Sequence, residues 1–295
     1  MRAAAIFGPG CCAQDLRPFQ ANSESHWIIG LPDKSSEADA IVIFGGDGTM
    51  HRHLPQLVKL QLPVLVVPSG SGNDFARALK LRGVRDSLAA WRKFSSPGNN
   101  VREIDLGLIT PVADKNCAGE APAELGHLFC CVGGVGLDAE IARRANLLPR
   151  WLRGHGGYVL SLLPALLKFA PVSASISFFA RNAFVSAPFR RIMVAAFANA
   201  PTYGGGMKIA PRAELDDGRL DICIVGDINK SALFCLFPTI YFGRHLRIPQ
   251  VEYCQTERLR IETKNPTAVY ADGEYVCRTP VEVSVVPKAL RVIVP

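Results

Sequence analysis

The stretch Ala40-Ile41-Val42-Ile43-Phe44-Gly45-Gly46-Asp47-Gly48-Thr49 decides the fold class of this chain. Its apolar start has no polar interruption, which is typical of a strand buried on both faces of a parallel sheet. A glycine-rich turn follows, and the apolar spacing of Met50 to Leu60 predicts a helix. The pattern then repeats, because we expect a strand over Pro63 to Val67, a second turn, and a helix over Asn73 to Leu81. Strands that alternate with helices predict an α/β domain with a parallel sheet.

Beyond about Arg102 the sequence predicts a mostly β domain. Apolar and β-branched runs are separated there by Gly, Pro, Asn and Asp at the spacing of a β-sandwich. The expected strands cover Ile104 to Ile109, Leu128 to Val132, Ser175 to Phe179, Ile192 to Ala198, Leu220 to Val225, Arg258 to Thr263 and Val281 to Val286. The expected helices cover Leu137 to Leu147, Tyr158 to Phe169 and Lys230 to Tyr241. Pro111 to Gly126 has neither pattern, and we expect a surface excursion there.

Composition and charge exclude several classes of protein. The chain has 295 residues, 48% hydrophobic and 20% charged, which excludes disorder and allows one large core or two medium ones. Lys and Arg number 33 against 26 Asp and Glu, and this net charge of +7 favours anionic partners such as nucleotides or acidic membrane surfaces. No nucleic-acid-binding motif accompanies the basic pairs, so we expect no DNA or RNA partner.

Two further sequence features bear on location. The longest apolar stretch, Tyr158 to Ala170, is interrupted by Pro164 and Lys168 and is too short to span a membrane. The residues after Met1 lack the long apolar run of a secretory signal. We therefore expect a cytoplasmic protein, either soluble or peripheral at the inner face of the membrane.

The nine cysteines are odd in number and lie mostly in apolar runs, such as Cys130-Cys131. They lack the paired Cys-x-x-Cys spacing of zinc sites. We therefore expect buried, reduced thiols rather than disulfides.

The turn from Gly45 to Thr49 has the composition of a phosphate-binding loop. Its glycines, Gly45, Gly46 and Gly48, allow backbone N–H groups to approach a phosphate, and the following helix start favours negative charge. A carboxylate at this position would repel phosphate unless a cation lies between them, so Asp47 implies Mg²⁺. The alternative is a plain tight turn in which Asp47 or Thr49 caps the helix.

A second turn of the same kind follows the next strand. Pro68-Ser69-Gly70-Ser71-Gly72-Asn73-Asp74-Phe75 again combines glycines, hydroxyls and a carboxylate at a helix start. Two such turns on adjacent strands are expected to converge on one ligand. The alternative is a helix cap made by Ser, Asn or Asp, with Phe75 and Leu79 packed beneath it.

Further motifs follow in a fixed order along the chain. They are Gly133-Gly134-Val135-Gly136-Leu137-Asp138-Ala139, Tyr203-Gly204-Gly205-Gly206-Met207, Pro211-Arg212-Ala213, Asp217-Gly218-Arg219-Leu220-Asp221 and Asp272-Gly273-Glu274. Together with the two turns, they resemble the soluble lipid kinases that share the diacylglycerol kinase catalytic domain, a family that includes sphingosine kinases. The Gly-Gly-Asp-Gly-Thr element is shared with NAD kinases and phosphofructokinases. The Gly-Asn-Asp-Phe turn and the Asp-Gly-Glu near the end point to the lipid branch.

The resemblance implies an α/β plus β fold. A Rossmann-like, NAD kinase-like nucleotide-binding domain would cover residues 1–102 plus a C-terminal tail of about 288–295. A β-sandwich domain that binds lipid and metal would cover residues 103–287. The activity it implies is ATP-dependent transfer of the γ-phosphoryl group to a hydroxyl of a diacylglycerol-like or sphingoid lipid at a membrane surface. A homodimer is compatible with the sequence.

The resemblance also assigns residues to roles. The ATP-binding residues would be Gly45, Gly46, Asp47, Gly48, Thr49, Gly70, Ser71, Gly72 and Asn73. Asp47 and Asp74 would join a network of water and Mg²⁺. A further Mg²⁺ would bind the side chain of Asp217 and the backbone carbonyls of Glu214 and Arg219, where the alternative is a solvated acidic turn. The base that takes the proton from the lipid hydroxyl would be Asp272, with Glu274 as the second candidate. The alternative is that this segment is a plain hairpin tip.

Some positions depart from the family pattern. Phe7-Gly8-Pro9-Gly10 lacks the usual Asn, and His51-Arg52 replaces the usual Asn-Glu. Adenine recognition and the choice of nucleotide are therefore open. Leu147 to Phe169 combines apolar and basic residues, which suits either an interfacial surface or a basic-rimmed core helix. The alternative functions are a kinase of a soluble metabolite, resembling NAD kinase, and a non-catalytic nucleotide or lipid sensor.

Overall fold

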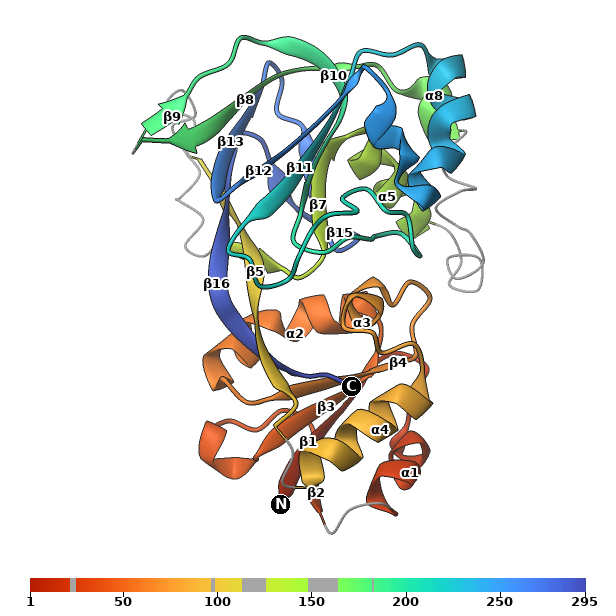
Figure 1. Ribbon diagram of the computed structural model, residues 1–295, viewed down its shortest axis with the longest axis vertical. Helices are drawn as coiled ribbons and strands as arrows, with labels where there is room; N and C mark the ends of the chain where they lie inside the picture. The colour runs from red at the N-terminus through yellow and green to blue at the C-terminus, as the bar shows by residue number, and fades with distance from the viewer. Residues whose placement is uncertain (22–24, 97–98, 113–125, 148–163, 182) are drawn as a thin grey trace. The chain divides into compact units, whose positions relative to one another are not determined.

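The computed structural model describes residues 1–21, 25–96, 99–112, 126–147, 164–181 and 183–295, and these residues form two compact units (Figure 1). Unit 1 comprises Met1–Asp105 and Pro287–Pro295, and unit 2 comprises Leu106–Val286. The sequence placed the boundaries after residues 102 and 287, and the units divide after residues 105 and 286. The chain leaves unit 1 within strand β5 (Val101–Pro111) and returns to it within strand β16 (Val281–Ile293).

Unit 1 is built on a parallel sheet, as the sequence predicts. The strand order is β16-β4-β3-β1-β2, and each neighbouring pair runs parallel. The strands besides β16 are β1 (Arg2–Phe7), β2 (His26–Ile29), β3 (Ala40–Gly45) and β4 (Val64–Pro68). Every residue of β3 is buried. The uninterrupted apolar run identified this strand correctly because a central parallel strand has no solvated face.

The helices of unit 1 pack their apolar faces against this sheet. They are α1 (Arg17–Gln20), α2 (Asp47–Leu60), α3 (Asp74–Ala78) and α4 (Val84–Ser95), with 3-10 turns η1 (Ala13–Leu16) and η2 (Ser35–Glu37). In α2 the side chains of Met50, Leu54 and Leu57 are fully buried. Their i, i+4, i+7 spacing puts them on one face of the helix.

The expected helix from Asn73 to Leu81 is shorter than predicted. It ends at Ala78, because Lys80 takes a left-handed φ of 64°. The N–H of Leu81 then donates to the carbonyl of Ala76 over 2.8 Å, a bond that closes a helix end. Lys80 is neither Gly nor Asn, so the sequence carries no signal for this stop.

Unit 2 is an antiparallel β structure, which confirms the predicted β-sandwich class. Its main strand order is β15-β14-β7-β10-β8-β13-β16, with β11 on β10, β12 on β11, β6 on β5 and β9 on β8. The strands not yet given are β6 (His127–Phe129), β7 (Val132–Gly136), β8 (Val172–Ala180), β9 (Ala183–Val185), β10 (Arg190–Ala198), β11 (Leu220–Gly226), β12 (Val251–Thr256), β13 (Arg258–Thr263), β14 (Ala268–Ala271) and β15 (Glu274–Arg278). A core that includes Phe129, Phe197 and Ile261 joins these strands.

Two predicted elements of unit 2 are divided in the structure. The run Leu128 to Val132 forms two strands, β6 and β7, with a bend at Cys130 and Cys131 between them. The helix expected over Lys230 to Tyr241 is α8 (Lys230–Leu236) followed by the 3-10 turns η3 (Phe237–Phe242) and η4 (Arg244–Arg247). Pro238 explains this second change, because it lacks the N–H that an α-helix would need there.

Helix α5 (Leu137–Leu147) matches its prediction and packs in a second apolar cluster with Met193 and Val225. Residues 158–163 of the expected helix Tyr158 to Phe169 lie outside the described residues, as do residues 113–125 of the expected surface excursion. The eight described cysteines form no disulfides, as predicted, although Cys12, Cys235 and Cys254 are exposed rather than buried.

Candidate functional site

The two glycine turns of unit 1 meet, as their positions on adjacent strands predict. The N–H of Ser69 donates to the carbonyl of Gly45 over 3.1 Å. A Cβ atom on Gly70 would lie 2.5 Å from the Cα of Gly46, and a Cβ on Gly46 would lie 2.8 Å from the Cα of Gly70. Only glycine fits at both positions, so the backbones of the two turns lie in direct contact.

Asn73 closes the second turn on itself. Its Oδ1 accepts from the N–H of Gly70 over 2.9 Å, and its Nδ2 donates to the carbonyl of Gly70 over 2.7 Å. Its φ is 53°, in the left-handed region that Asn tolerates better than most residues. Asn73 therefore holds the shape of the turn with both ends of its side chain.

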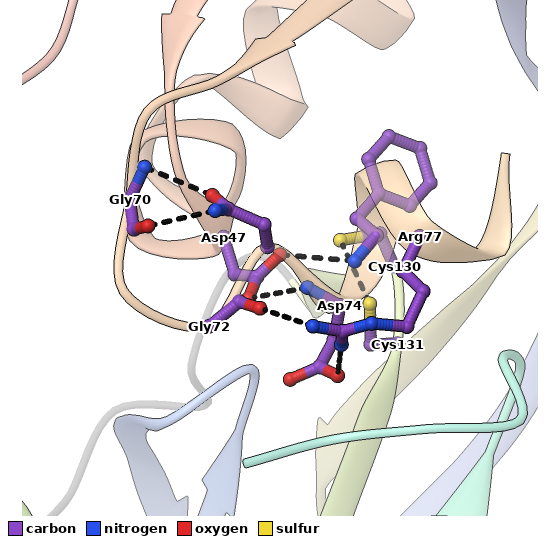
Figure 2. Close-up of polar contacts among 9 residues, drawn as sticks. Asp47, Gly70, Gly72, Asp74, Arg77, Cys130 and Cys131 are labelled. Carbon is purple, nitrogen blue, oxygen red and sulfur yellow. Dashed lines mark hydrogen bonds and ion pairs between the residues drawn. The ribbon is translucent and has the colours of Figure 1, made fainter. Parts of the chain in front are cut away.

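The carboxylate of Asp47 joins the two turns (Figure 2). Its Oδ2 accepts from the N–H of Asp74 over 2.9 Å, and its Oδ1 accepts from the N–H of Phe75 over 3.0 Å. Asp47 thus caps the next helix, α3, instead of its own. The alternative in which Asp47 or Thr49 caps its own helix α2 does not hold, because the N-cap of α2 is Gly46 and no side chain caps it.

The negative charge of Asp74 is balanced by a basic residue of unit 1. Its side chain is 2% exposed and forms an ion pair with Arg77, whose guanidinium also donates to the carbonyl of Gly72 over 3.1 Å (Figure 2). A buried carboxylate needs such a partner because desolvation disfavours its charge. Arg77 was not among the predicted site residues, although its position three residues after Asp74 on a helix favours an ion pair.

The remaining turn residues differ in exposure. Ser71 is exposed and Gly72 is half-buried, so both can meet a ligand. Thr49 is only 6% exposed. A Cβ atom on Gly8 would lie 2.4 Å from the hydroxyl oxygen of Thr49, and a Cβ atom on Gly45 would lie 2.6 Å from it. Thr49 therefore packs against the end of β1, and Gly8 is the small residue that makes room for it.

In unit 2, the segment Asp272-Gly273-Glu274 is a tight hairpin tip between β14 and β15. Asp272 and Gly273 have φ values of 50° and 84°, the two left-handed positions of a type I′ turn. The Oδ2 of Asp272 accepts from the N–H of Cys130 and its Oδ1 accepts from the N–H of Cys131, each over 2.8 Å. Its own N–H donates to the carbonyl of Val132 over 2.9 Å. Asp272 therefore clamps the bend between β6 and β7.

Glu274 has a different environment from Asp272. It is the first residue of β15, and its side chain is exposed. Within the described part of the chain, no hydrogen bond or ion pair engages its carboxylate. The two acids of the hairpin are therefore distinguished by the structure: Asp272 is held by backbone donors, and Glu274 is available to a ligand.

The acidic loop before β11 concentrates negative charge. The Oδ1 of Asp217 accepts from the N–H of Arg219 over 3.0 Å, and its Oδ2 accepts from Gln255 over 3.3 Å. Asp221 is 1% exposed and accepts from the hydroxyl of Tyr253 over 2.6 Å. Burial raises the pKa of Asp221, and the nearby charges of Asp217 and Glu214 raise it further. A cation bound here would lower this electrostatic cost, so the donor set fits Mg²⁺.

A model of the diacylglycerol kinase catalytic domain matches residues 22–109. A model of the YegS C-terminal NAD kinase beta sandwich-like domain matches residues 131–294. A diacylglycerol kinase of Mycobacterium tuberculosis is 31% identical over 281 residues, which cover 93% of this chain and 82% of the relative. The chain belongs to the diacylglycerol kinase family.

Other members of the family agree with this placement. A diacylglycerol kinase of Bacillus subtilis is 26% identical over 262 residues, covering 88% of this chain and 78% of the relative. The crystal structure of a diacylglycerol kinase from Bacillus anthracis superposes with a TM-score of 0.68 at 17% identity, covering 100% of this chain and 97% of the other. That likeness concerns the fold. The predicted family, fold class and lipid kinase activity are thus confirmed, and use of ATP follows from the kinase family.

Two other glycine-rich motifs have structural places in this kinase. A Cβ atom on Gly134 would lie 2.6 Å from an oxygen of Asp138, which is itself only 6% exposed at the start of α5. Tyr203 and Met207 pair across Gly204, Gly205 and Gly206, all three with positive φ. Gly134 therefore leaves room for the side chain of Asp138, and the glycines of the second motif provide its left-handed backbone.

The sequence missed the partners that hold these residues. Besides Arg77, they include the backbone donors at Cys130 and Cys131 and the side chains of Tyr253 and Gln255. Except for Arg77, each lies more than thirty positions along the chain from the acid that it holds, so no local sequence pattern indicates the contact. Of the helices that the structure describes, none combines the length and the hydropathy that crossing a membrane requires.

Proposed function

We propose that this protein transfers the γ-phosphoryl group of ATP to the hydroxyl of a diacylglycerol-type lipid, with unit 1 binding the nucleotide and unit 2 supplying the acceptor and metal chemistry. The observation that carries this proposal is the pair of touching glycine turns held together by Asp47. The acceptor class is supported by the curated relatives, which bear the name diacylglycerol kinase.

The turns of unit 1 would bind the nucleotide phosphates. Glycine backbones at a helix start present N–H groups and a positive potential to an anion. We assign this role to Gly45, Gly46, Gly48 and the segment 70–73, with Ser71 as an exposed hydroxyl. Thr49 and Asn73 would act by shaping the turns, since Thr49 is buried and the side chain of Asn73 is bonded to Gly70.

Mg²⁺ would be held by oxygen donors. The exposed carboxylate of Asp217, with the carbonyls of Glu214 and Arg219, offers the hard ligands that this ion prefers. Asp47 and Asp74 would join the network of water and Mg²⁺ around the phosphates, although each carboxylate already has partners in the protein. When bound, Mg²⁺ neutralises charge that develops on the transferred phosphoryl group.

We assign the role of general base to Glu274 and a positioning role to Asp272. Both carboxylate oxygens of Asp272 already accept backbone N–H bonds, so this side chain is held in place by the protein itself. The exposed Glu274 carries no such bonds among the described residues. Asp272 fixes the hairpin on which Glu274 stands, and Glu274 would take the proton of the lipid hydroxyl.

The assay is transfer of labelled phosphate from Mg-ATP to diacylglycerol in mixed micelles, with Mg-GTP and Mg-CTP as alternative donors and with NAD and sugars as soluble acceptors. Glu274→Gln should lower kcat by about 10²–10⁴-fold without changing stability. Asp272→Asn should lower both activity and stability, because its amide would place a donor against a backbone N–H. Glu257→Gln, an exposed acid elsewhere in unit 2, is the matched control.

Three outcomes would overturn parts of this proposal. Full activity in Glu274→Gln would remove Glu274 as the base. Labelling of a soluble acceptor alone would favour a metabolite kinase resembling NAD kinase. Binding of Mg-ATP without turnover on any acceptor would favour a nucleotide or lipid sensor.

The surface of α8 and η3 suits access to a membrane-borne lipid. No residue of α8 is fully buried, and Phe234 is 47% and Phe242 is 72% exposed. Leu167 is 68% exposed, and its carbonyl accepts from Lys230 over 3.0 Å. Exposed basic residues accompany these apolar ones, namely Lys168, Arg244 and Arg247. Apolar side chains among basic ones are the composition of a peripheral contact with anionic lipid, and we infer that this surface docks on the membrane.

A further inference from the structure

We propose that Cys130, Cys131 and Asp272 form a binding site for a thiophilic divalent cation, with Zn²⁺ as its occupant. One ligand atom from each of these residues lies within 4.8 Å of the other two. Among the described residues, no other group of three such side chains is this compact. The site differs from the proposed Mg²⁺ loop in both place and chemistry, because thiolates select zinc over magnesium.

The distances match those of tetrahedral coordination. Two sulfurs at about 2.3 Å from a tetrahedral Zn²⁺ lie about 3.8 Å apart. The Sγ atoms of Cys130 and Cys131 are 3.9 Å apart (Figure 2). A sulfur and a carboxylate oxygen on the same ion lie about 3.6 Å apart. The Sγ of Cys130 and the Oδ2 of Asp272 are 3.4 Å apart. The ion would therefore need little movement of these side chains.

The bend between β6 and β7 explains why neighbouring cysteines face the same way. In a regular strand, successive side chains point to opposite faces. Cys130 and Cys131 lie outside both strands, in the bend that Asp272 clamps. Both thiols are buried, at 0% and 2% exposure, and neither forms a disulfide. Asp272 is half-buried, which leaves a side from which an ion and a fourth, water ligand can approach.

The backbone of this bend is held rigidly by its neighbours. Asn199 donates from its Nδ2 to the carbonyl of Cys130 over 3.2 Å and from its backbone N–H to the carbonyl of Cys131 over 2.8 Å. The N–H of Ala200 also donates to the carbonyl of Cys131, over 3.1 Å. A rigid backbone keeps the three ligand atoms together before the ion arrives, which favours binding.

Binding would exchange protons for the metal. Each thiol loses its proton to solvent as its sulfur bonds to Zn²⁺, and one oxygen of Asp272 becomes the third ligand. The contact between the Cys130 thiol and Asp272 is then replaced by two metal bonds. Because Glu274 stands on the same hairpin, we expect occupancy to lower phosphoryl transfer. This inhibition rests on the role proposed for the hairpin, whereas metal binding does not.

The test is a Co²⁺ titration of the full, reduced, chelator-treated chain, since Co²⁺ in a tetrahedral thiolate site absorbs visible light. We expect one equivalent to bind and Zn²⁺ to displace it. Cys131→Ala should abolish the absorption, and Asp272→Asn should weaken binding about tenfold or more. Cys254→Ala and Cys277→Ala are matched controls, because these reduced cysteines of unit 2 lie outside the cluster and should leave binding unchanged.

X-ray absorption of the zinc-loaded wild-type chain keeps the proposal testable if the cysteine variants fail to fold. Two sulfur ligands and two lighter ligands would support the site. Fewer than two sulfurs, no bound ion, or the same absorption in folded Cys131→Ala would overturn it. A disulfide between Cys130 and Cys131 in the chain as isolated, persisting after reduction, would overturn it as well. Zinc binding without inhibition would leave the site intact and remove only its link to catalysis.

Discussion

Replacing Asp47 with alanine should destabilise unit 1 specifically. The variant removes the acceptor for two backbone N–H groups, those of Asp74 and Phe75 at the start of α3. Hydrogen bonds to a charged group contribute about 1.5–3 kcal/mol each, and loss of a single helix cap costs about 1 kcal/mol. Because Asp47 is half-buried, water can replace part of each bond. We therefore expect a loss of about 2–4 kcal/mol in the free energy of unfolding.

The assay is urea unfolding followed by tryptophan fluorescence. Trp27 and Trp91 belong to unit 1, and their rings lie 5.2 Å apart. A Trp151→Phe background leaves only these two of the 3 tryptophans to report. With a slope of about 1–3 kcal/mol per molar urea, the midpoint should fall by about 1–2 M.

Asp86→Ala is the matched control for Asp47→Ala. Asp86 is another acid of unit 1, and it accepts from one exposed N–H, that of Arg82, over 2.9 Å. Its removal should cost about 1 kcal/mol. An Asp47→Ala midpoint equal to that of the wild type, with an unchanged slope, would refute the reasoning. It would show that the two bonds contribute nothing and that Asp47 is present for its charge alone.

Two further predictions concern the nucleotide turn and pH. Gly70→Ala should weaken nucleotide binding about tenfold to a hundredfold, because its Cβ would lie 2.5 Å from Gly46, whereas Gly83→Ala meets nothing within 4 Å and should bind normally. His245 is buried and its Nε2 bonds to the carbonyl of Ile209; burial lowers its pKa, so the unfolded chain takes up a proton first as the pH falls. Stability should therefore be full above the unfolded pKa and decline as the pH falls through about 6.5 toward 5, by up to about 1.4 kcal/mol per pH unit. Denaturant unfolding at several pH values should show a smaller decline in His245→Gln, and an equal decline in both proteins would contradict this assignment.

The parts of the fold that the sequence predicted correctly are those set by local pattern. Strand β3 was readable because burial on both faces leaves only apolar residues. Helix α5 has its predicted ends, and the glycine turns lie where adjacent parallel strands must bring them. The helix expected over Lys230 to Tyr241 was predicted too long, although Pro238, which has no N–H to donate, is a local signal for its end.

The errors arose where distant residues decide local structure. The break at Cys130 and Cys131 depends on Asp272, more than a hundred positions away, and the apolar run alone predicts one continuous strand. The hydrogen bonds of Asp47 to the start of α3 were not predicted, because that helix follows the next strand along the chain. The acidic hairpin could be located from sequence, but only the positions of the backbone donors distinguish Asp272 from Glu274.

The path of the chain through β5 and β16 has a consequence for its synthesis. Unit 2 interrupts unit 1 in the sequence, and residues 287–295 complete the sheet of unit 1 beside β4. The Nδ2 of Asn100 donates to the carbonyl of Val294 over 2.6 Å, and the N–H of Val294 donates to the carbonyl of Asn100 over 2.9 Å. On the ribosome, the first hundred residues must therefore wait, with the edge of β4 unpaired, until all of unit 2 has been translated. Such an exposed edge is prone to aggregation, so this waiting period is where we expect nascent chains to need a chaperone.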